Sequence, residues 1–236
     1  MRILITNDDG RYAEQLFPLI DFCKSLGDVF VCVPKLEQSG KSHGIELHKP
    51  FEAKREEIDG ITVWTVDSTP ADCVRFAVLG LKEKFDLVIS GINRGLNLGI
   101  DMLYSGTVSA TCEAAILGIK AIALSVSPED YNEATKNLKT VFDYILSNDL
   151  LSKHTLYNVN MPNSPKGILI THQGGPYYSD DFVHIGNDMY TPVGKCVYED
   201  RNDLTIDTDA VMHGYISIMP LTIDKTCKIA YNNLRK

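Results

Sequence analysis

Two adjacent carboxylates, Asp8 and Asp9, directly follow an apolar run near the start of the chain, and Gly10 comes after them. Residues 3–5 are apolar without alternation, which is typical of a strand buried on both faces of a parallel sheet. Ligands of such sheets bind beyond the carboxyl ends of the strands. The pattern therefore predicts a site that starts at this acidic pair. A plain Asn-Asp-Asp-Gly turn would use the same residue types.

Two further oxygen donors, Ser39 and Asn93, come after later predicted strands. The carboxyl ends of parallel strands share one edge of the sheet, so folding could bring them to Asp8 and Asp9. Two carboxylates, a hydroxyl and an amide carbonyl suit Mg²⁺ or Mn²⁺, whereas zinc favours Cys and His. We expect one divalent ion per subunit on these four residues, with Asp8, Asp9 and Asn93 as catalytic residues. Either later residue alone could equally serve loop hydrogen bonding.

The segment Ser105, Gly106 and Thr107 stands at the start of a predicted helix over residues 108–117. A helix N-terminus offers free backbone amides and a positive dipole end, which bind phosphate. Asn97 and Gly40, in neighbouring loops, are expected to add donors. A divalent ion next to such a phosphate site favours hydrolysis of a phosphate ester.

Other phosphate chemistries fit this sequence less well. It contains no G-x-x-x-x-G-K-[ST] loop, and its glycines at 91, 95 and 99 do not form G-x-G-x-x-G. A phosphatase that works through an aspartyl phosphate would want a carboxylate at Asn7, so water is the expected nucleophile. A non-catalytic, metal-dependent nucleotide sensor is the alternative, and turnover would separate the two.

The composition limits which binding partners and which cellular compartment we expect. The chain has 236 residues, 44% of them hydrophobic, and a formal net charge of -8. The acidic balance argues against duplex nucleic acid and an anionic membrane as partners. Neither a signal segment nor a membrane-length apolar run is visible, so we expect a cytoplasmic protein. The six cysteines show no C-x-x-C spacing and are predicted to be reduced thiols.

The elements that must position these residues alternate between strand and helix. Strands are predicted at 28–33, 85–90, 119–125 and 156–161, and helices at 16–26, 108–117 and 128–147. Asp59-Gly60 predicts a hairpin turn, and Ser68 or Thr69 can cap the helix that follows it. The fold class is therefore α/β, with a Rossmann-like, mostly parallel sheet flanked by helices.

The last third of the chain reads differently. Residues 174–202 are rich in Gly, Tyr and Asp without clear periodicity, which indicates an extended arm or hairpin. Short strands or helices are expected at 168–171 and 207–221. We predict a catalytic core over residues 1–163 and a β-rich C-terminal arm and tail over residues 164–236. This second part should pack on the core and on a partner subunit.

Several motifs together resemble the SurE survival proteins, a family of metal-dependent 5'/3'-nucleotidases. They include ILITNDDG at 3–10, VPKLEQSGKS at 33–42, STPADCV at 68–74, DLVISGINRGLNLG at 86–99, YSGTVSA at 104–110, YNVNMP at 157–162 and TDAVMHGYISIMPL at 208–221.

The resemblance implies a hydrolase of nucleoside 5'- and 3'-monophosphates. It places the ion at Asp8, Asp9, Ser39 and Asn93, and the phosphate near Asn97 and residues 105–107. It also implies a homodimer or homotetramer that exchanges its C-terminal arm. The chain departs from the family pattern at Glu14 and Gln15, where Pro-Gly is usual, and at Ser68, where glycine is usual.

Overall fold

The computed structural model describes residues 1–235, within which the main sheet has nine strands in the order β3-β4-β2-β1-β5-β6-β7-β11-β8. In chain order these strands are β1 Arg2–Thr6, β2 Asp28–Pro34, β3 Ala53–Ile58, β4 Ile61–Val66, β5 Leu87–Arg94, β6 Lys120–Val126, β7 Leu156–Met161, β8 Ile168–Ile170 and β11 Ile216–Pro220. Strands β4, β2, β1, β5, β6 and β7 run parallel to their neighbours in this series. The predicted α/β class with a mostly parallel sheet is confirmed.

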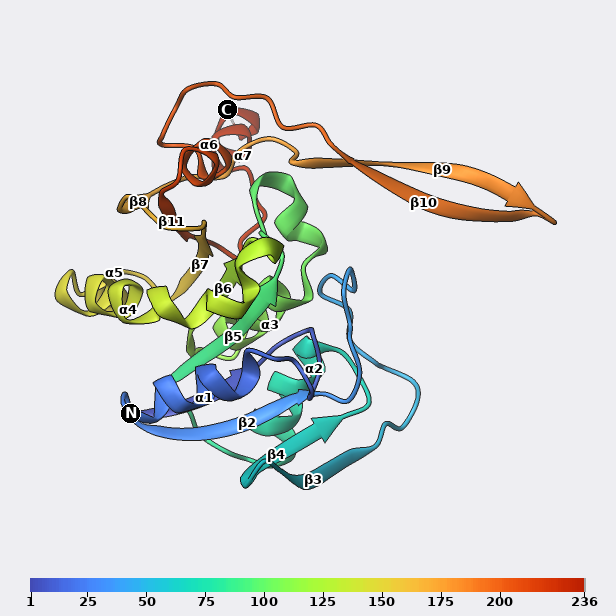
Figure 1. The fold of residues 1–236 in the computed structure, drawn as a ribbon, viewed down its shortest axis with the longest axis vertical. Helices are drawn as coiled ribbons and strands as arrows, with labels where there is room; N and C mark the ends of the chain where they lie inside the picture. Colours follow the sequence, from blue (N-terminus) through green and yellow to red (C-terminus); the bar gives the residue numbers. More distant parts are fainter. Residues whose placement is uncertain (236) are drawn as a thin grey trace.

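Helices cover both faces of the sheet (Figure 1). Their bounds are α1 Leu16–Lys24, α2 Pro70–Arg75, α3 Gly106–Ile116, α4 Leu138–Ser147, α5 Leu150–Lys153, α6 Asp207–Met212 and α7 Lys228–Leu234. Ile3 and Ile5 of β1 pack in the same core cluster as α1 and α4, whereas Leu4 packs with α2 and α3. Successive strand residues point to opposite faces, so three apolar residues in a row contribute to both cores.

Strand β1 occupies the position at which the order of the sheet reverses. The chain passes from β1 to β2 on one side, and β5 pairs with β1 on the other side. Open α/β sheets bind ligands in the crevice beyond the carboxyl ends of the strands at such a switch point. The topology therefore puts Asp8 and Asp9 at the crevice, with the loops after β2 and β5 on either side.

Two local predictions are confirmed by the geometry. Thr69 caps α2 by accepting a hydrogen bond from the N–H of Asp72 at 3.1 Å. Asp59 and Gly60 join β3 to β4 with positive φ angles of 49° and 75°, as a two-residue hairpin turn requires.

The single helix predicted over residues 128–147 is wrong in its first half. Residues Pro128–Asn137 form a 3₁₀ segment, and the α-helix starts only at Leu138. The first half offers Tyr131 and Ala134 to the core but no continuous apolar stripe, so packing does not favour a regular α-helix there. The short helices α5 and α7 were not predicted.

The arm is an antiparallel hairpin that projects away from the body (Figure 1). It consists of β9 Tyr178–Gly186 and β10 Met189–Cys196. After the hairpin the chain returns to the main sheet, where β11 pairs antiparallel with β7 and parallel with β8.

None of the helices formed by residues 1–235 is both long and apolar enough to cross a membrane.

Candidate active site

Asp8 is the most enclosed of the predicted metal ligands, with 3% of its surface exposed. Its carboxylate accepts hydrogen bonds from the hydroxyl of Thr107 and from the N–H of Thr107, the latter at 3.3 Å. Burial raises the pKa of Asp8, and the two bonds from Thr107 oppose that rise. The first acid is thus fixed against the N-terminus of α3.

Asp9 lies beside Asp8 and is only partly buried. Its Oδ2 accepts one long hydrogen bond, 3.3 Å, from the N–H of Arg94. Burial, together with the charge of Asp8, raises the pKa of Asp9 to about 7. Two carboxylates that resist ionisation side by side need positive charge to stay ionised together. A divalent cation would supply that charge.

The loop after β2 brings Ser39 to the same place. The N–H of Gln38 donates to the backbone oxygen of Asp8 at 2.7 Å, so the next residue is held at the end of β1. Gly10 permits this approach, because a Cβ there would lie 3.0 Å from the backbone of Leu36. The Ser39 hydroxyl donates to Glu37 at 2.7 Å, which leaves its oxygen able to accept a cation.

Asn93 lies near the end of β5, which is the neighbour of β1 on the side opposite β2. The pairing of β5 with β6 shifts register between Ser90 and Asn93, next to a cis peptide bond between Gly91 and Ile92. The amide nitrogen of Asn93 donates to the backbone oxygen of Gly95 at 2.8 Å. Because the nitrogen is engaged, the carbonyl oxygen is the free end of the side chain, which suits a hard cation.

The four predicted ligands therefore come from segments that contact one another at the end of β1. Within residues 1–235, no three or more His, Cys, Asp or Glu side chains gather to hold a metal ion. The predicted set combines the two carboxylates with the oxygens of Ser39 and Asn93. That all-oxygen set fits Mg²⁺ or Mn²⁺.

In the expected phosphate site, residues 105–107, several of the polar groups already have partners within the protein. Ser105 caps α3, with its hydroxyl accepting from the N–H of Val108 at 3.1 Å. Thr107 gives both its hydroxyl and its N–H to Asp8, so these donors are already used. Among the described residues, only Gly106 of the three has an N–H without a hydrogen-bond partner. Gly106 is the donor best placed for an anion.

Asn97 and Gly40, the other two expected phosphate donors, differ in whether their donors are already engaged. The side-chain amide of Asn97 donates to the hydroxyl of Ser125 at 2.8 Å, and its backbone is held by Asn158 and Asn160. Asn97 is therefore an anchor of the loop after β5 in this structure. Gly40 is exposed with φ of 69°, and open space surrounds the position of a Cβ.

Sequence reasoning missed Asn158 and Asn160, although a signal for them exists. Both side chains are fully buried in β7, and both donate to the backbone oxygen of Asn97, at 2.8 and 3.0 Å. Two asparagines two positions apart in an otherwise apolar strand are costly to bury unless they bind something. Here they fix the loop that follows β5 and Asn93.

A second set of polar contacts ties the loop after β2 to the helices α2 and α3. His43 Nε2 lies 2.9 Å from one oxygen of Glu113, and Arg75 donates to the other oxygen at 2.9 Å. Burial raises the pKa of Glu113, but these two partners outweigh burial and hold it below its ordinary value. Ser68 donates to Asp72, so the unusual serine supports α2.

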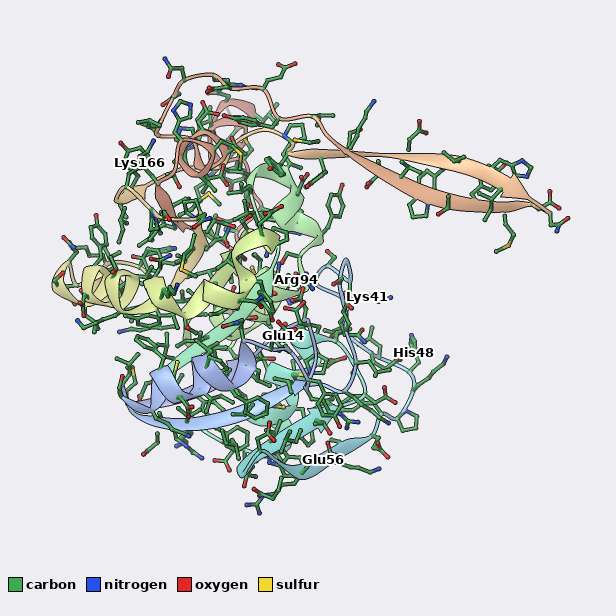
Figure 2. All side chains as sticks on the ribbon, viewed as in Figure 1. Glu14, Lys41, His48, Glu56, Arg94 and Lys166 are labelled. Atoms are coloured by element: carbon green, nitrogen blue, oxygen red, sulfur yellow. The ribbon has the colours of Figure 1, made fainter. Side chains whose placement is uncertain are left out.

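Two exposed cationic side chains belong to the segments next to the acidic pair. Lys41 belongs to the loop after β2, and Arg94 ends β5, with its guanidinium 5.8 Å from the ring centre of Tyr131 (Figure 2). Glu37, also in the loop after β2, contributes negative charge that raises the pKa of both Asp8 and Asp9. The segments around Asp8 and Asp9 therefore carry charges of both signs.

Comparison with known proteins identifies consistent relatives over the whole chain. The sequence profile of the family described as Survival protein SurE matches residues 3–180. The 5'-nucleotidase SurE of Natranaerobius thermophilus is 40% identical over 256 residues, covering 99% of this chain and 97% of that protein. The 5'-nucleotidase SurE of Thermoanaerobacter sp. strain X514 is 41% identical over 238 residues, covering 96% and 94%. The crystal structure of the SurE protein from Aquifex aeolicus superposes with a TM-score of 0.82 at 34% identity, covering 100% and 98%.

Proposed function

This chain belongs to the SurE family, and from that premise we propose that it is a nucleotidase that hydrolyses nucleoside 5'- and 3'-monophosphates with one bound Mg²⁺ or Mn²⁺. The observation that carries the proposal is the pair of adjacent carboxylates at the switch point of the sheet, Asp8 buried and Asp9 partly buried, beside the free N–H of Gly106. The relatives named 5'-nucleotidase support the nucleotidase class. The cytoplasmic location stays a prediction.

In this proposal each residue has a separate task. Asp8, Asp9, Ser39 and Asn93 would hold the ion, which supplies Lewis-acid charge to the phosphoryl oxygens. Gly106 would bind a phosphate oxygen through its N–H at the positive end of α3. Thr107 keeps the carboxylate of Asp8 oriented, and the asparagines of β7 keep the loop of Asn93 in place. Hydrolysis then needs a water in line with the leaving oxygen.

A phosphate-release assay tests the proposal directly. The protein should be stripped with a chelator, then assayed with 5'-AMP, 5'-GMP and 3'-AMP, each with Mg²⁺, Mn²⁺ or no added ion. We expect phosphate from the monophosphates only when an ion is present. Stoichiometric nucleotide binding without phosphate release under every metal would instead support the nucleotide sensor.

We also propose that the hairpin holds subunits together as a homodimer or homotetramer. It exposes large apolar side chains, among them Phe182 at 66%, Ile185 at 62% and Tyr190 at 61%. An isolated two-stranded hairpin is marginally stable in water, and apolar surface of this kind marks an interaction site.

Light scattering of two proteins checks the oligomer prediction. The intact chain should have at least twice the 26.2 kDa mass of one subunit, whereas replacement of residues 179–195 by Gly-Gly-Ser should give monomers. Phe182→Ser should weaken association without removing the hairpin. An intact chain that stays monomeric at micromolar concentration would contradict the prediction.

A further inference from the structure

A cavity of about 360 Å³ lies next to the candidate active site, beyond the carboxyl ends of β5, β6 and β7. Its volume falls in the range of small-molecule sites, which are lined mostly by apolar and aromatic side chains with few polar groups. The apolar and aromatic part of its lining includes Leu96, Pro128, Pro162, Tyr177, Tyr178 and Met212. Glu129 and Asn163 add polar groups to the wall.

The cavity and the predicted metal ligands share one loop. Gly95 lines the cavity, and its backbone oxygen accepts the hydrogen bond from the side chain of Asn93 at 2.8 Å. Two residues apart, the Cα atoms of Asn93 and Gly95 are separated by at most about 7.6 Å. The wall of this cavity is therefore close to Asn93.

Hydrogen bonds to a carboxylate fix the aromatic part of the cavity wall. Tyr177 and Tyr178 stand edge to face, with ring centres 4.9 Å apart. The backbone N–H groups of both tyrosines donate to one oxygen of Asp101, at 3.2 and 2.7 Å. This carboxylate belongs to the 3₁₀ segment Gly99–Tyr104, which directly follows the loop of Asn93. The tyrosines are thus positioned relative to the active site before any ligand arrives.

A second carboxylate ties the same segments together. Asp207, fully buried on α6, accepts from the N–H of Gly99 and from the N–H of Gly174, each at 2.7 Å. Gly99 can approach this closely because it has no side chain: a Cβ there would lie 1.9 Å from the backbone oxygen of Gly175. Asp207 therefore connects the loop after β5 to the segment that leads into β9. These two segments form one continuous wall of the cavity.

We propose that this cavity binds the nucleobase of the substrate, with Tyr178 and Tyr177 as the residues that distinguish a nucleotide from a simple sugar phosphate. The proposal rests on the proposed function, because it takes the phosphate to lie at Gly106. Bases stack on aromatic side chains regardless of sequence, since every base has a π-face. Glu129 and Asn163 offer hydrogen-bonding groups to the polar edge of a base.

Steady-state kinetics with two substrates test the inference. Tyr178→Ala should raise KM for 5'-AMP about tenfold while changing kcat little. The same variant should leave kcat and KM for ribose 5-phosphate, which has no base, unchanged. Tyr178→Phe keeps the ring and should restore the KM for 5'-AMP. Leu146→Ala, which removes an exposed apolar side chain from α4, outside both the cavity and the hairpin, is the matched control.

The outcomes separate this inference from the proposed function. Equal losses with 5'-AMP and ribose 5-phosphate would show a structural role for Tyr178 and overturn the inference, as would wild-type kinetics in the variant. If the wild type releases phosphate from neither substrate, the proposed function fails. Calorimetry with adenosine then still decides about the cavity, because wild-type binding that weakens in Tyr178→Ala supports it and absence of binding overturns it.

Discussion

Asp8→Asn should lower kcat/KM for 5'-AMP by at least about 100-fold, as expected when a metal site loses a charged ligand. The substitution keeps the shape of the side chain and an oxygen that can accept from Thr107, so the fold should persist. It removes one of two negative charges that would hold the divalent ion. Phosphate release measured across Mg²⁺ and Mn²⁺ concentrations would show the loss. Asp21→Asn, at an exposed ion pair on α1, is the matched control and should keep full activity.

Thermal unfolding gives a second readout of the same site. Burial and the charge of Asp8 raise the pKa of Asp9 from 3.8 to about 7. The metal-free folded state therefore keeps a proton that the unfolded chain has lost, so this group's stabilising contribution falls as pH rises from about 4 to 7. A cation replaces that proton. Added Mn²⁺ should consequently raise Tm more at pH 8 than at pH 5, and Asp9→Asn should reduce this difference.

Two results would contradict the metal site. One is full turnover in the chelated protein. The other is a wild-type rate in Asp8→Asn at low metal concentration.

Gly106→Ala is the second substitution with a large expected effect. A Cβ at this position would lie 3.0 Å from Cβ of Asp8 and 3.1 Å from Cγ of Pro70. It would also lie 3.2 Å from Oδ2 of Asp8, so either the acid or α3 must shift. We expect kcat/KM to fall at least about 100-fold, on the scale of losing a preorganised donor to the reacting group. Overpacking should lower the free energy of unfolding by about 1–3 kcal/mol.

Urea unfolding and phosphate release measured together separate these two effects. Gly167→Ala is the matched control, because its nearest neighbour, Tyr215, would be 3.7 Å from the new Cβ, an ordinary contact. Gly106→Val should act in the same direction as alanine and more strongly. Activity equal to that of the wild type in Gly106→Ala would show that neither Asp8 nor the N–H of residue 106 needs its present position.

Some features of this protein follow from the sequence because their causes are local. An apolar run that stops at two acids produces β1 with Asp8 and Asp9 at its end, and Thr69 before a proline produces a capped helix. The turn at Asp59-Gly60 follows from residues that tolerate positive φ. Alternation of such strands and helices was enough to predict the α/β class and to place Asp8 and Asp9 at the carboxyl ends of the parallel strands.

Other features depend on contacts between segments that are far apart in the chain. The hydrogen bonds of Thr107 to Asp8 join residues 99 positions apart, and those of Asn97 to Asn160 join residues 63 positions apart. A sequence pattern shows that a helix N-terminus can bind an anion, but it does not show whether another side chain already occupies its donors. Only the tertiary structure shows that Gly106 retains a free N–H. It also shows that Thr107 binds Asp8 and that Asn97 binds Ser125. It also decided that Tyr177 and Tyr178 lie beside the loop of Asn93, because Asp101 and Asp207 link segments that no local signal connects.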